Sequence, residues 1–291
     1  MSIKKILITG AGGQLGKALL AKIPPGYQAI AANRETLDIT TQRDVFEFFD
    51  GLELSGVINA AAYTAVDKAE SQAEAATAVN EHGVTNLGLA AREYDLPIIH
   101  VSTDFVFDGS KGTPYLPHDK REPKSVYGQS KADGEDALLA IDKLQSTIIR
   151  TAWVYNTDDA NFVTTMLRLM QERDSLGIVA DQIGTPTHVS GLAEACWFFL
   201  RQEEAGVFHW TDAGVASWYD FAVAIQTTAL KAGLLTRQIP LKPIKTSDYP
   251  TPAIRPHYSV LDKTSCWVSM EILPEHWQSV LQTALSKKQL Q

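Results

Sequence analysis

Short apolar runs alternate with longer amphipathic segments through the first half of the chain. Five runs have the length and composition of buried parallel strands, and they lie at 3–9, 28–32, 56–59, 96–102 and 146–151. Helical periodicity separates them, most clearly over 69–94 and 125–141. Because strands alternate with helices in this order, we expect an α/β fold with a doubly wound parallel sheet.

The pattern changes after residue 152, where strand-like pieces become short. Helical periodicity recurs in three segments, near 162–172, 191–201 and 218–232. The Pro-rich stretch 240–256 lacks periodicity and predicts an ordered loop. We therefore divide the chain into a first domain, 1–152, and a smaller C-terminal lobe, 153–291. A crossing of the chain between the two parts would leave no trace in this pattern.

Composition narrows the class of protein. The chain has 291 residues, of which 45% are hydrophobic, and a net charge of -8 that argues against broad binding to nucleic acid or anionic membranes. Cys196 and Cys266 show neither metal-ligand spacing nor a disulfide framework. No apolar run approaches the roughly 18 residues of a membrane span, and the first residues predict a strand, not a signal peptide. We expect a cytoplasmic protein that binds neither nucleic acid nor membrane.

Three glycines, Gly10, Gly13 and Gly16, lie between the first predicted strand and the helix that follows it. Gly10 permits a tight turn, Gly13 lets the backbone approach a pyrophosphate, and Gly16 permits close packing of the helix. The helix N-terminus then offers amide donors and a positive dipole end to phosphates. This context predicts a dinucleotide-binding first domain and not a generic strand-to-helix turn.

The end of the second predicted strand indicates which dinucleotide binds. A carboxylate there would favour NAD by contacting the adenosine ribose. This chain has Asn33 and Arg34 instead, and Arg34 is suited to pairing with a 2′-phosphate. The prediction is therefore NADPH, with NADH as the alternative cofactor and an exposed, solvated arginine as the alternative explanation of Arg34. Asp38 and Ile39 are expected near the adenine.

Tyr127 and Lys131 are four residues apart in the predicted helix 125–141, so their side chains share one face. A lysine that lowers the pKa of a nearby tyrosine makes the phenol a proton donor usable near neutral pH. Thr103 follows the strand 96–102, at the edge where open parallel sheets bind ligands. Its hydroxyl is suited to holding a substrate oxygen, and capping of the strand end is the alternative. Together these residues predict hydride transfer coupled to protonation of a carbonyl oxygen.

Other polar residues have structural explanations. His100 lies within a predicted strand and is interpreted as a core histidine and not as a base. Asp67, Glu70 and Glu74 predict a solvated helix start. No His, Cys and Asp cluster has convincing metal spacing, so no metal ligand is assigned.

The motif Gly10-x-x-Gly13-x-x-Gly16 with Tyr127-x-x-x-Lys131 resembles the extended short-chain dehydrogenase/reductase superfamily, which implies a Rossmann-like sheet with a substrate-binding C-terminal lobe. Longer blocks resemble the dTDP-4-dehydrorhamnose reductase family more specifically, and they lie at 59–70, 102–109, 127–131, 150–155 and 181–187. The resemblance spans nearly the whole chain and ends with Arg255 and Pro256.

This resemblance implies reduction of the C4 keto group of dTDP-4-dehydro-β-L-rhamnose to dTDP-β-L-rhamnose by NADPH or NADH, in dTDP-rhamnose biosynthesis. It makes Tyr127 the proton donor and Lys131 its partner, and it suggests that Arg255 closes over the nucleotide end. The implied substrate contacts are Thr103, Asp104, Tyr127, Trp153 and Arg255. The implied cofactor contacts, besides the glycines, are Gln14, Leu15, Ala62, Tyr63, Thr64, Tyr127 and Lys131.

One position departs from the family. Some members form a dimer around Mg²⁺ with an acidic residue early in the first helix, where this chain has Ala18. That puts Mg²⁺ in doubt, and we expect a monomer or a weak homodimer. Two alternative functions stay open: a reductase or epimerase of another nucleotide-linked deoxysugar, and a non-catalytic protein resembling the regulatory subunit of methionine adenosyltransferase. The intact set of Thr103, Tyr127 and Lys131 favours catalysis.

Overall fold

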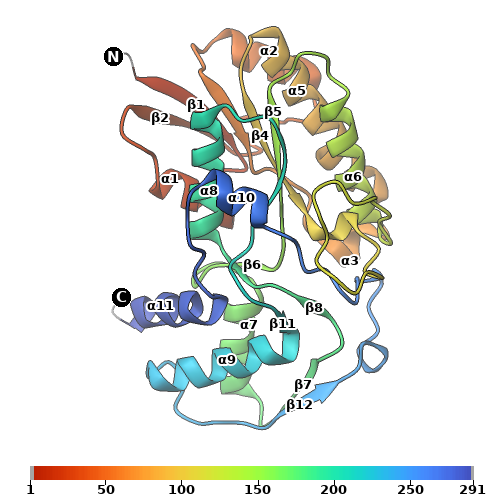
Figure 1. Ribbon diagram of the computed structural model, residues 1–291, viewed down its shortest axis with the longest axis vertical. Coiled ribbons are helices and arrows are strands. Elements are labelled where there is room, and N and C mark those ends of the chain that lie inside the picture. Colours follow the sequence, from red (N-terminus) through yellow and green to blue (C-terminus); the bar gives the residue numbers. More distant parts are fainter. Residues whose placement is uncertain (1–2, 290–291) are drawn as a thin grey trace.

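The computed structural model describes residues 3–289, and a six-stranded parallel sheet forms its first layer (Figure 1). The strand order β10-β5-β4-β3-β1-β2 confirms the predicted doubly wound α/β fold. The strands are β1 Lys4–Thr9, β2 Tyr27–Ala32, β3 Gly56–Asn59, β4 Ile98–Thr103, β5 Ser146–Thr151 and β10 Gly206–His209. The five strands predicted in the first half are thus confirmed to within two residues at each end.

Alternating side chains of the strands bury themselves against helices on both faces, as a parallel sheet requires. In β1, Ile6 and Ile8 pack in one cluster with the helices α1 Gln14–Ala21, α8 Val189–Gln202 and α10 Thr264–Ser269. Leu7 packs in the opposite cluster with α2 Gln42–Asp50, α5 Gly83–Glu93 and α6 Val126–Leu139.

The segment predicted as one long helix, 69–94, is divided. It comprises α3 Val66–Ala69, α4 Ala73–Thr77, a π-helical turn η1 Ala78–His82, and then α5. The π turn begins directly where α4 ends, so the helix continues through a local widening and not through a break.

The C-terminal lobe packs three helices around a second apolar core. These helices are α7 Phe162–Glu172, α9 Trp218–Lys231 and α11 Trp277–Gln289. Short strand pairs complete the lobe: β6 Val154–Tyr155 with β9 Thr187–His188, β7 Leu176–Val179 with β12 Leu241–Ile244, and β8 Ile183–Gly184 with β11 Ala216–Ser217. Two single-turn helices are η2 Asp104–Val106 and η3 Thr246–Asp248. The predicted loop 240–256 therefore contains a strand, β12, which hydrogen bonds in parallel to β7.

The chain crosses between the two parts. The chain after residue 153 supplies β10, an edge strand of the parallel sheet, and the helices α8 and α10, which pack on the sheet. Figure 1 shows α8 lying along the sheet. A simple division into 1–152 and 153–291 therefore does not describe the sheet, which takes its sixth strand from residues 206–209. The crossing contributes to the main core, since Trp197 and Phe199 of α8 are buried there.

Candidate functional site

A cavity of about 630 Å³ opens at the carboxyl ends of the parallel strands. This is the edge of an open α/β sheet at which ligands bind. Among the residues predicted from the sequence, those lining the cavity are Gly10, Gly13, Gln14, Leu15, Asn33, Arg34, Asp38, Ile39, Ala62, Tyr63, Thr64, Thr103, Asp104, Tyr127, Lys131 and Trp153. Gly16 and Arg255 are not part of the lining.

The glycine loop brings backbone to the cavity wall. Gly10 has a φ of +65°, and a Cβ there would lie 2.6 Å from the carbonyl oxygen of Ala60, so glycine is required on two counts. A Cβ on Gly16 would lie 2.3 Å from the carbonyl oxygen of Gly10, which gives Gly16 its packing role away from the lining. Helix α1 starts directly after Gly13 and points its free amides at the loop. This cradle fits a pyrophosphate.

The loop after β2 forms the far end of the cavity. Asn33 accepts a hydrogen bond from the Thr36 amide at 3.0 Å and so shapes the turn that carries Arg34. Arg34 is exposed and lines the cavity, which leaves its guanidinium free for an anion. The pKa of Asp38 is lowered, chiefly by hydrogen bonds from Thr40, with a smaller effect from the charge of Arg34.

The small-residue segment after β3 is anchored by a residue that the sequence did not single out. Asn80, in the π turn η1, accepts from the Tyr63 amide at 2.9 Å and donates to the Tyr63 carbonyl oxygen at 3.1 Å. Asn80 also donates to Ser130 of α6 at 3.0 Å. The π turn thus places one amide side chain where it joins the cavity segment to the helix that carries Tyr127. Only the Ala-rich helical pattern marked this region in the sequence.

Helix α6 positions the predicted proton donor. Ser125 caps the helix by accepting from the Gly128 amide at 3.1 Å, and both Tyr127 and Lys131 line the cavity, as their spacing predicted. A Cβ on Gly128 would lie 2.3 Å from the carbonyl oxygen of Phe105, so this glycine lets the helix approach the segment after β4. The ring of Phe105 packs edge-on against the ring of Tyr127, with the ring centroids 5.5 Å apart.

The proton state of the pair differs from the expectation. Burial raises the pKa of Tyr127 to about 12, a change increased by the charge of Asp104 and opposed by the hydroxyl of Thr103. Burial lowers the pKa of Lys131 to about 8, against the opposing charge of Glu135. The charge of Lys131 is not among the causes of the Tyr127 pKa shift, so the predicted lowering is not seen. The Lys131 nitrogen donates to the Val101 carbonyl oxygen at 2.7 Å. Tyr127 therefore keeps its proton at neutral pH and can donate it.

The Thr103 hydroxyl has a capping role in the structure, and its predicted contact with a substrate oxygen stays a prediction. The hydroxyl accepts from the Phe105 amide at 3.2 Å, which caps η2, and it donates to Asp104 at 3.0 Å. Burial raises the pKa of Asp104 to about 6, while hydrogen bonds from Ser259 and Thr103 oppose that change. Thr103 and Asp104 thus line the cavity together with Tyr127.

A buried ionic network fixes the rotation of α6. Glu135, eight residues after Tyr127 on the same face, is fully buried and accepts from Arg150 of β5 at 2.7 and 2.9 Å. Arg121 donates to the same carboxylate at 3.0 Å, and Ser102 of β4 donates to it as well. Such a network keeps the face that carries Tyr127 directed at the cavity.

Trp153 closes the cavity from the C-terminal lobe. Its φ is +47°, a left-handed conformation that a bulky residue rarely adopts. The ring stacks on Trp218 with centroids 3.6 Å apart, and a Cβ on Gly184 would lie 2.6 Å from it. The sequence did not single out Trp218, and it marked Gly184 only as part of the block 181–187.

Two predicted roles take another form in the structure. Arg255 pairs with Asp67 through contacts of 2.7 and 3.0 Å, which ties the Pro-rich segment to the start of α3. Asp67 and Glu70 are therefore structural partners and not merely solvated, since Glu70 accepts from the Val126 amide at 2.9 Å. His100 is fully buried, as the interpretation as a core histidine predicted.

Ala18 lies on α1, partly buried against the first core. Within residues 3–289, no group of three or more His, Cys, Asp and Glu side chains is placed to hold a metal ion. Over the same residues, the helices are too short or too polar to cross a membrane.

Comparison with known proteins gives full-length matches. The family described as RmlD substrate binding domain matches residues 4–290. The dTDP-4-dehydrorhamnose reductase of Aggregatibacter actinomycetemcomitans is 42% identical over an alignment of 285 residues, and the alignment covers 95% of this chain and 97% of that protein. The crystal structure of a dTDP-4-dehydrorhamnose reductase from Clostridium acetobutylicum superposes with a TM-score of 0.92 at 38% identity, covering 98% of this chain and 99% of that one. A Bacillus anthracis reductase in complex with NADP gives a TM-score of 0.92 at 30% identity, covering 99% and 100%.

Proposed function

Because the chain belongs to the RmlD substrate binding domain family, we propose that it reduces the C4 keto group of dTDP-4-dehydro-β-L-rhamnose with NADPH, yielding dTDP-β-L-rhamnose. The observation that carries the proposal is the convergence of Tyr127, Lys131 and Thr103 on one cavity with the glycine loop. A relative whose structure contains NADP supports the choice of cofactor. The product belongs to dTDP-rhamnose biosynthesis.

The glycine loop and the start of α1 would hold the pyrophosphate, and Arg34 would pair with the 2′-phosphate that distinguishes NADPH from NADH. Ala62 and Tyr63 line the same cavity as Lys131, which would bond the nicotinamide ribose. When bound, the dihydronicotinamide supplies the hydride. NADH is the alternative hydride donor.

Tyr127 donates its proton to the C4 oxygen as the hydride reaches the carbon. Its raised pKa keeps the phenol protonated until a charge develops on that oxygen. In the substrate complex the Thr103 hydroxyl turns its single proton from Asp104 to the same oxygen and orients the carbonyl. Asp104 contacts the sugar hydroxyls and Trp153 packs on the sugar face. No Mg²⁺ enters this scheme.

The test is NADPH oxidation followed by absorbance with dTDP-4-dehydro-L-rhamnose as substrate, compared with NADH and with other dTDP-linked 4-keto-6-deoxysugars. Product identity is confirmed by mass spectrometry and NMR. Faster turnover of another nucleotide-linked sugar would replace the substrate and keep the reaction. Absence of turnover with every substrate, together with co-purification of an adenosyltransferase, would replace catalysis with the regulatory role.

A further inference from the structure

A chain of buried polar groups runs beneath the cavity and ends at Lys131. Thr9 donates to the side-chain oxygen of Asn59 at 2.7 Å, and the side-chain nitrogen of Asn59 lies 3.0 Å from Nδ1 of His100. Nε2 of His100 lies 3.2 Å from the Lys131 Nζ. These four side chains are buried, and they come from β1, β3, β4 and α6.

A backbone amide fixes which groups donate and which accept along this series of hydrogen bonds. Ala61 N–H donates to Oδ1 of Asn59 at 3.1 Å, and a backbone N–H acts only as a donor. Turning the Asn59 amide over would set its NH₂ group against that N–H. The amide orientation is therefore determined, and the NH₂ group donates to Nδ1 of His100.

The tautomer of His100 follows from this direction. Burial, with the charge of Lys131, lowers the pKa of His100 well below its ordinary value, so the ring is neutral and holds one proton. Nδ1 accepts from Asn59, which places that proton on Nε2. An ammonium has no acceptor, so a charged Lys131 faces a donor across the 3.2 Å contact. A neutral amine accepts from His100 and still donates to the Val101 carbonyl oxygen.

We propose that His100 is a positioning residue whose Nε2–H biases Lys131 toward the neutral amine and thereby sets the upper pH limit of the proposed reaction. The limit on turnover rests on the proposed function, whereas the tautomer and the lysine titration do not. Other titratable groups near Lys131 are Tyr127 and Glu135 on α6 and Asp104 after β4. Glu135 favours the ammonium and is itself paired with Arg150, so it opposes the effect of His100.

The expected pH dependence of activity follows from the protonation state of Lys131 that the reaction needs. The ammonium is the form that bonds a ribose hydroxyl as a charged donor, and it is present below the pKa of Lys131. Activity therefore falls as pH rises through that pKa, which is about 8. Removing the opposing donor raises the pKa and moves the fall in kcat/KM to higher pH.

The first measurement is the tautomer of His100 in the ¹⁵N-labelled wild-type protein, from the ring nitrogen shifts and couplings. His209 is an internal reference, because its Nδ1 faces the Asp262 carbonyl oxygen at 3.0 Å and must carry a proton. We expect His100 to be protonated on Nε2 and His209 on Nδ1. A proton on Nδ1 of His100 would overturn the proposal.

The second measurement uses the variant Asn59→Asp to reverse the direction of the hydrogen bonds that lead to Lys131. A carboxylate accepts from Ala61 and Thr9 and also from Nδ1–H of His100, which turns Nε2 into an acceptor for the ammonium. We expect the His100 tautomer to switch and the Lys131 pKa, followed by its side-chain carbon shift, to rise by at least about one unit, the equivalent of one hydrogen bond. The alkaline fall in kcat/KM should move with it.

His100→Gln is the matched control, since a glutamine amide can accept from Asn59 and donate to Lys131, which preserves the direction. We expect its Lys131 titration to stay within about 0.3 unit of wild type, a shift small beside that of Asn59→Asp. An unchanged lysine titration in Asn59→Asp, or a shift as large in His100→Gln, would contradict the proposal. If Asn59→Asp does not fold by circular dichroism, the wild-type tautomer and the His100→Gln titration still decide. If turnover is absent with every sugar, the proposed function fails while both spectroscopic results stand.

Discussion

The two walls of the cavity are built in different ways. The sheet wall is polar and fixed: Tyr127 and Lys131 come from one helix, which a buried carboxylate, Glu135, joins to β4 and β5. The lobe wall is aromatic and strained: Trp153 has a positive φ and is held by stacking on Trp218. The difference separates the chemistry, which needs charges and protons at fixed points, from recognition, which needs a shaped apolar surface.

The largest effect is expected on the sheet wall with Tyr127→Phe. Loss of the phenolic proton should lower kcat by about 10²–10⁴-fold, because general acid catalysis is removed while the ring still fills its place. Stopped-flow or steady-state kinetics measure kcat, and a fluorescence titration measures the affinity for NADPH. Cofactor affinity should stay within about twofold, a difference well below 1 kcal/mol. An unimpaired kcat would remove Tyr127 from its role.

The sheet wall should also carry a cost in stability that depends on pH. Asp104 has a pKa of about 6 when folded against 3.8 as the ordinary value, so folding favours its protonated form. Its contribution is fully present below about pH 4 and is lost as pH rises through 6. Asp104→Asn should therefore be more stable than wild type at pH 8, by about 2 kcal/mol, with little difference at pH 4.

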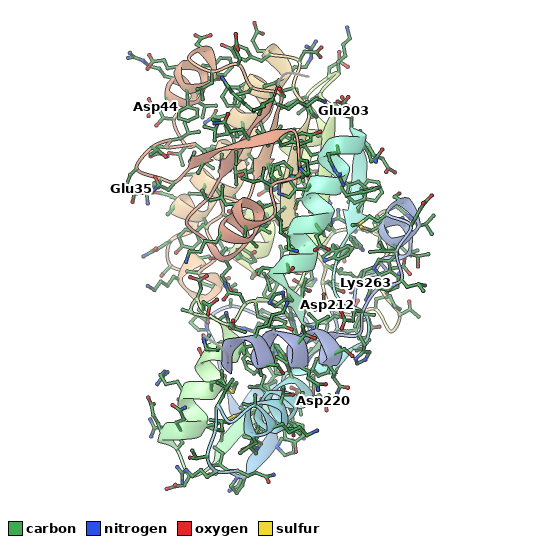
Figure 2. All side chains as sticks on the ribbon, turned by 90° about the vertical axis from the view of Figure 1, so that its left-hand side faces the viewer. Glu35, Asp44, Glu203, Asp212, Asp220 and Lys263 are labelled. Carbon is green, nitrogen blue, oxygen red and sulfur yellow. The ribbon has the colours of Figure 1, made fainter. Side chains whose placement is uncertain are left out.

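Urea unfolding of both proteins from pH 4 to pH 8 measures this difference. Asp44→Asn, an exposed change on α2 labelled in Figure 2, is the matched control and should show no comparable trend. A constant difference between Asp104→Asn and wild type across this range would show that the carboxyl is not buried in the protonated form.

The lobe wall is tested with Trp153→Ala, which removes the aromatic surface without touching a titratable group. We expect KM for the sugar nucleotide to rise about tenfold to thirtyfold, a loss of about 1.4–2 kcal/mol, with kcat nearly unchanged. Trp218→Ala keeps the cavity surface but removes the stacking partner, so it should give a smaller rise in KM. A fall confined to kcat in either variant would mean that the lobe wall takes part in the chemistry.

The smallest effect is expected at the exposed end of the cavity with Arg34→Ala. Loss of one solvent-exposed pairing should raise KM for NADPH about threefold to tenfold and leave KM for NADH unaltered. Glu35→Ala changes the neighbouring charge, which projects outward from the same loop (Figure 2), and should leave the ratio of the two constants near that of wild type. An unaltered NADPH preference in Arg34→Ala would leave Arg34 as a solvated arginine.

Local patterns predicted what local geometry controls. The strands ending at Thr9 and Thr103 are marked by apolar runs, and the four-residue spacing of Tyr127 and Lys131 alone put both on one helix face. The glycine at position 10 was readable because a turn with positive φ leaves few other choices.

Residues that act across long sequence separations were missed. Asn80 reaches Tyr63 through a π turn, Trp218 supports Trp153 from 65 positions away by number, and Glu135 meets Arg150 only because α6 packs on β5. The strand β12 was read as loop because its pairing partner β7 lies more than 60 residues earlier. In each case the signal resides in a contact and not in the segment itself.

The sequence by itself determined the doubly wound sheet, the glycine cradle and the pairing of a phenol with an amine, because periodicity and backbone sterics act within a few residues. Tertiary structure decided the proton states of that pair. Burial raises the pKa of Tyr127 and lowers that of Lys131, and a backbone amide at Ala61 directs a hydrogen-bond chain to the amine. Desolvation and bond direction depend on which groups surround an atom, and those groups come from four separate elements of the fold.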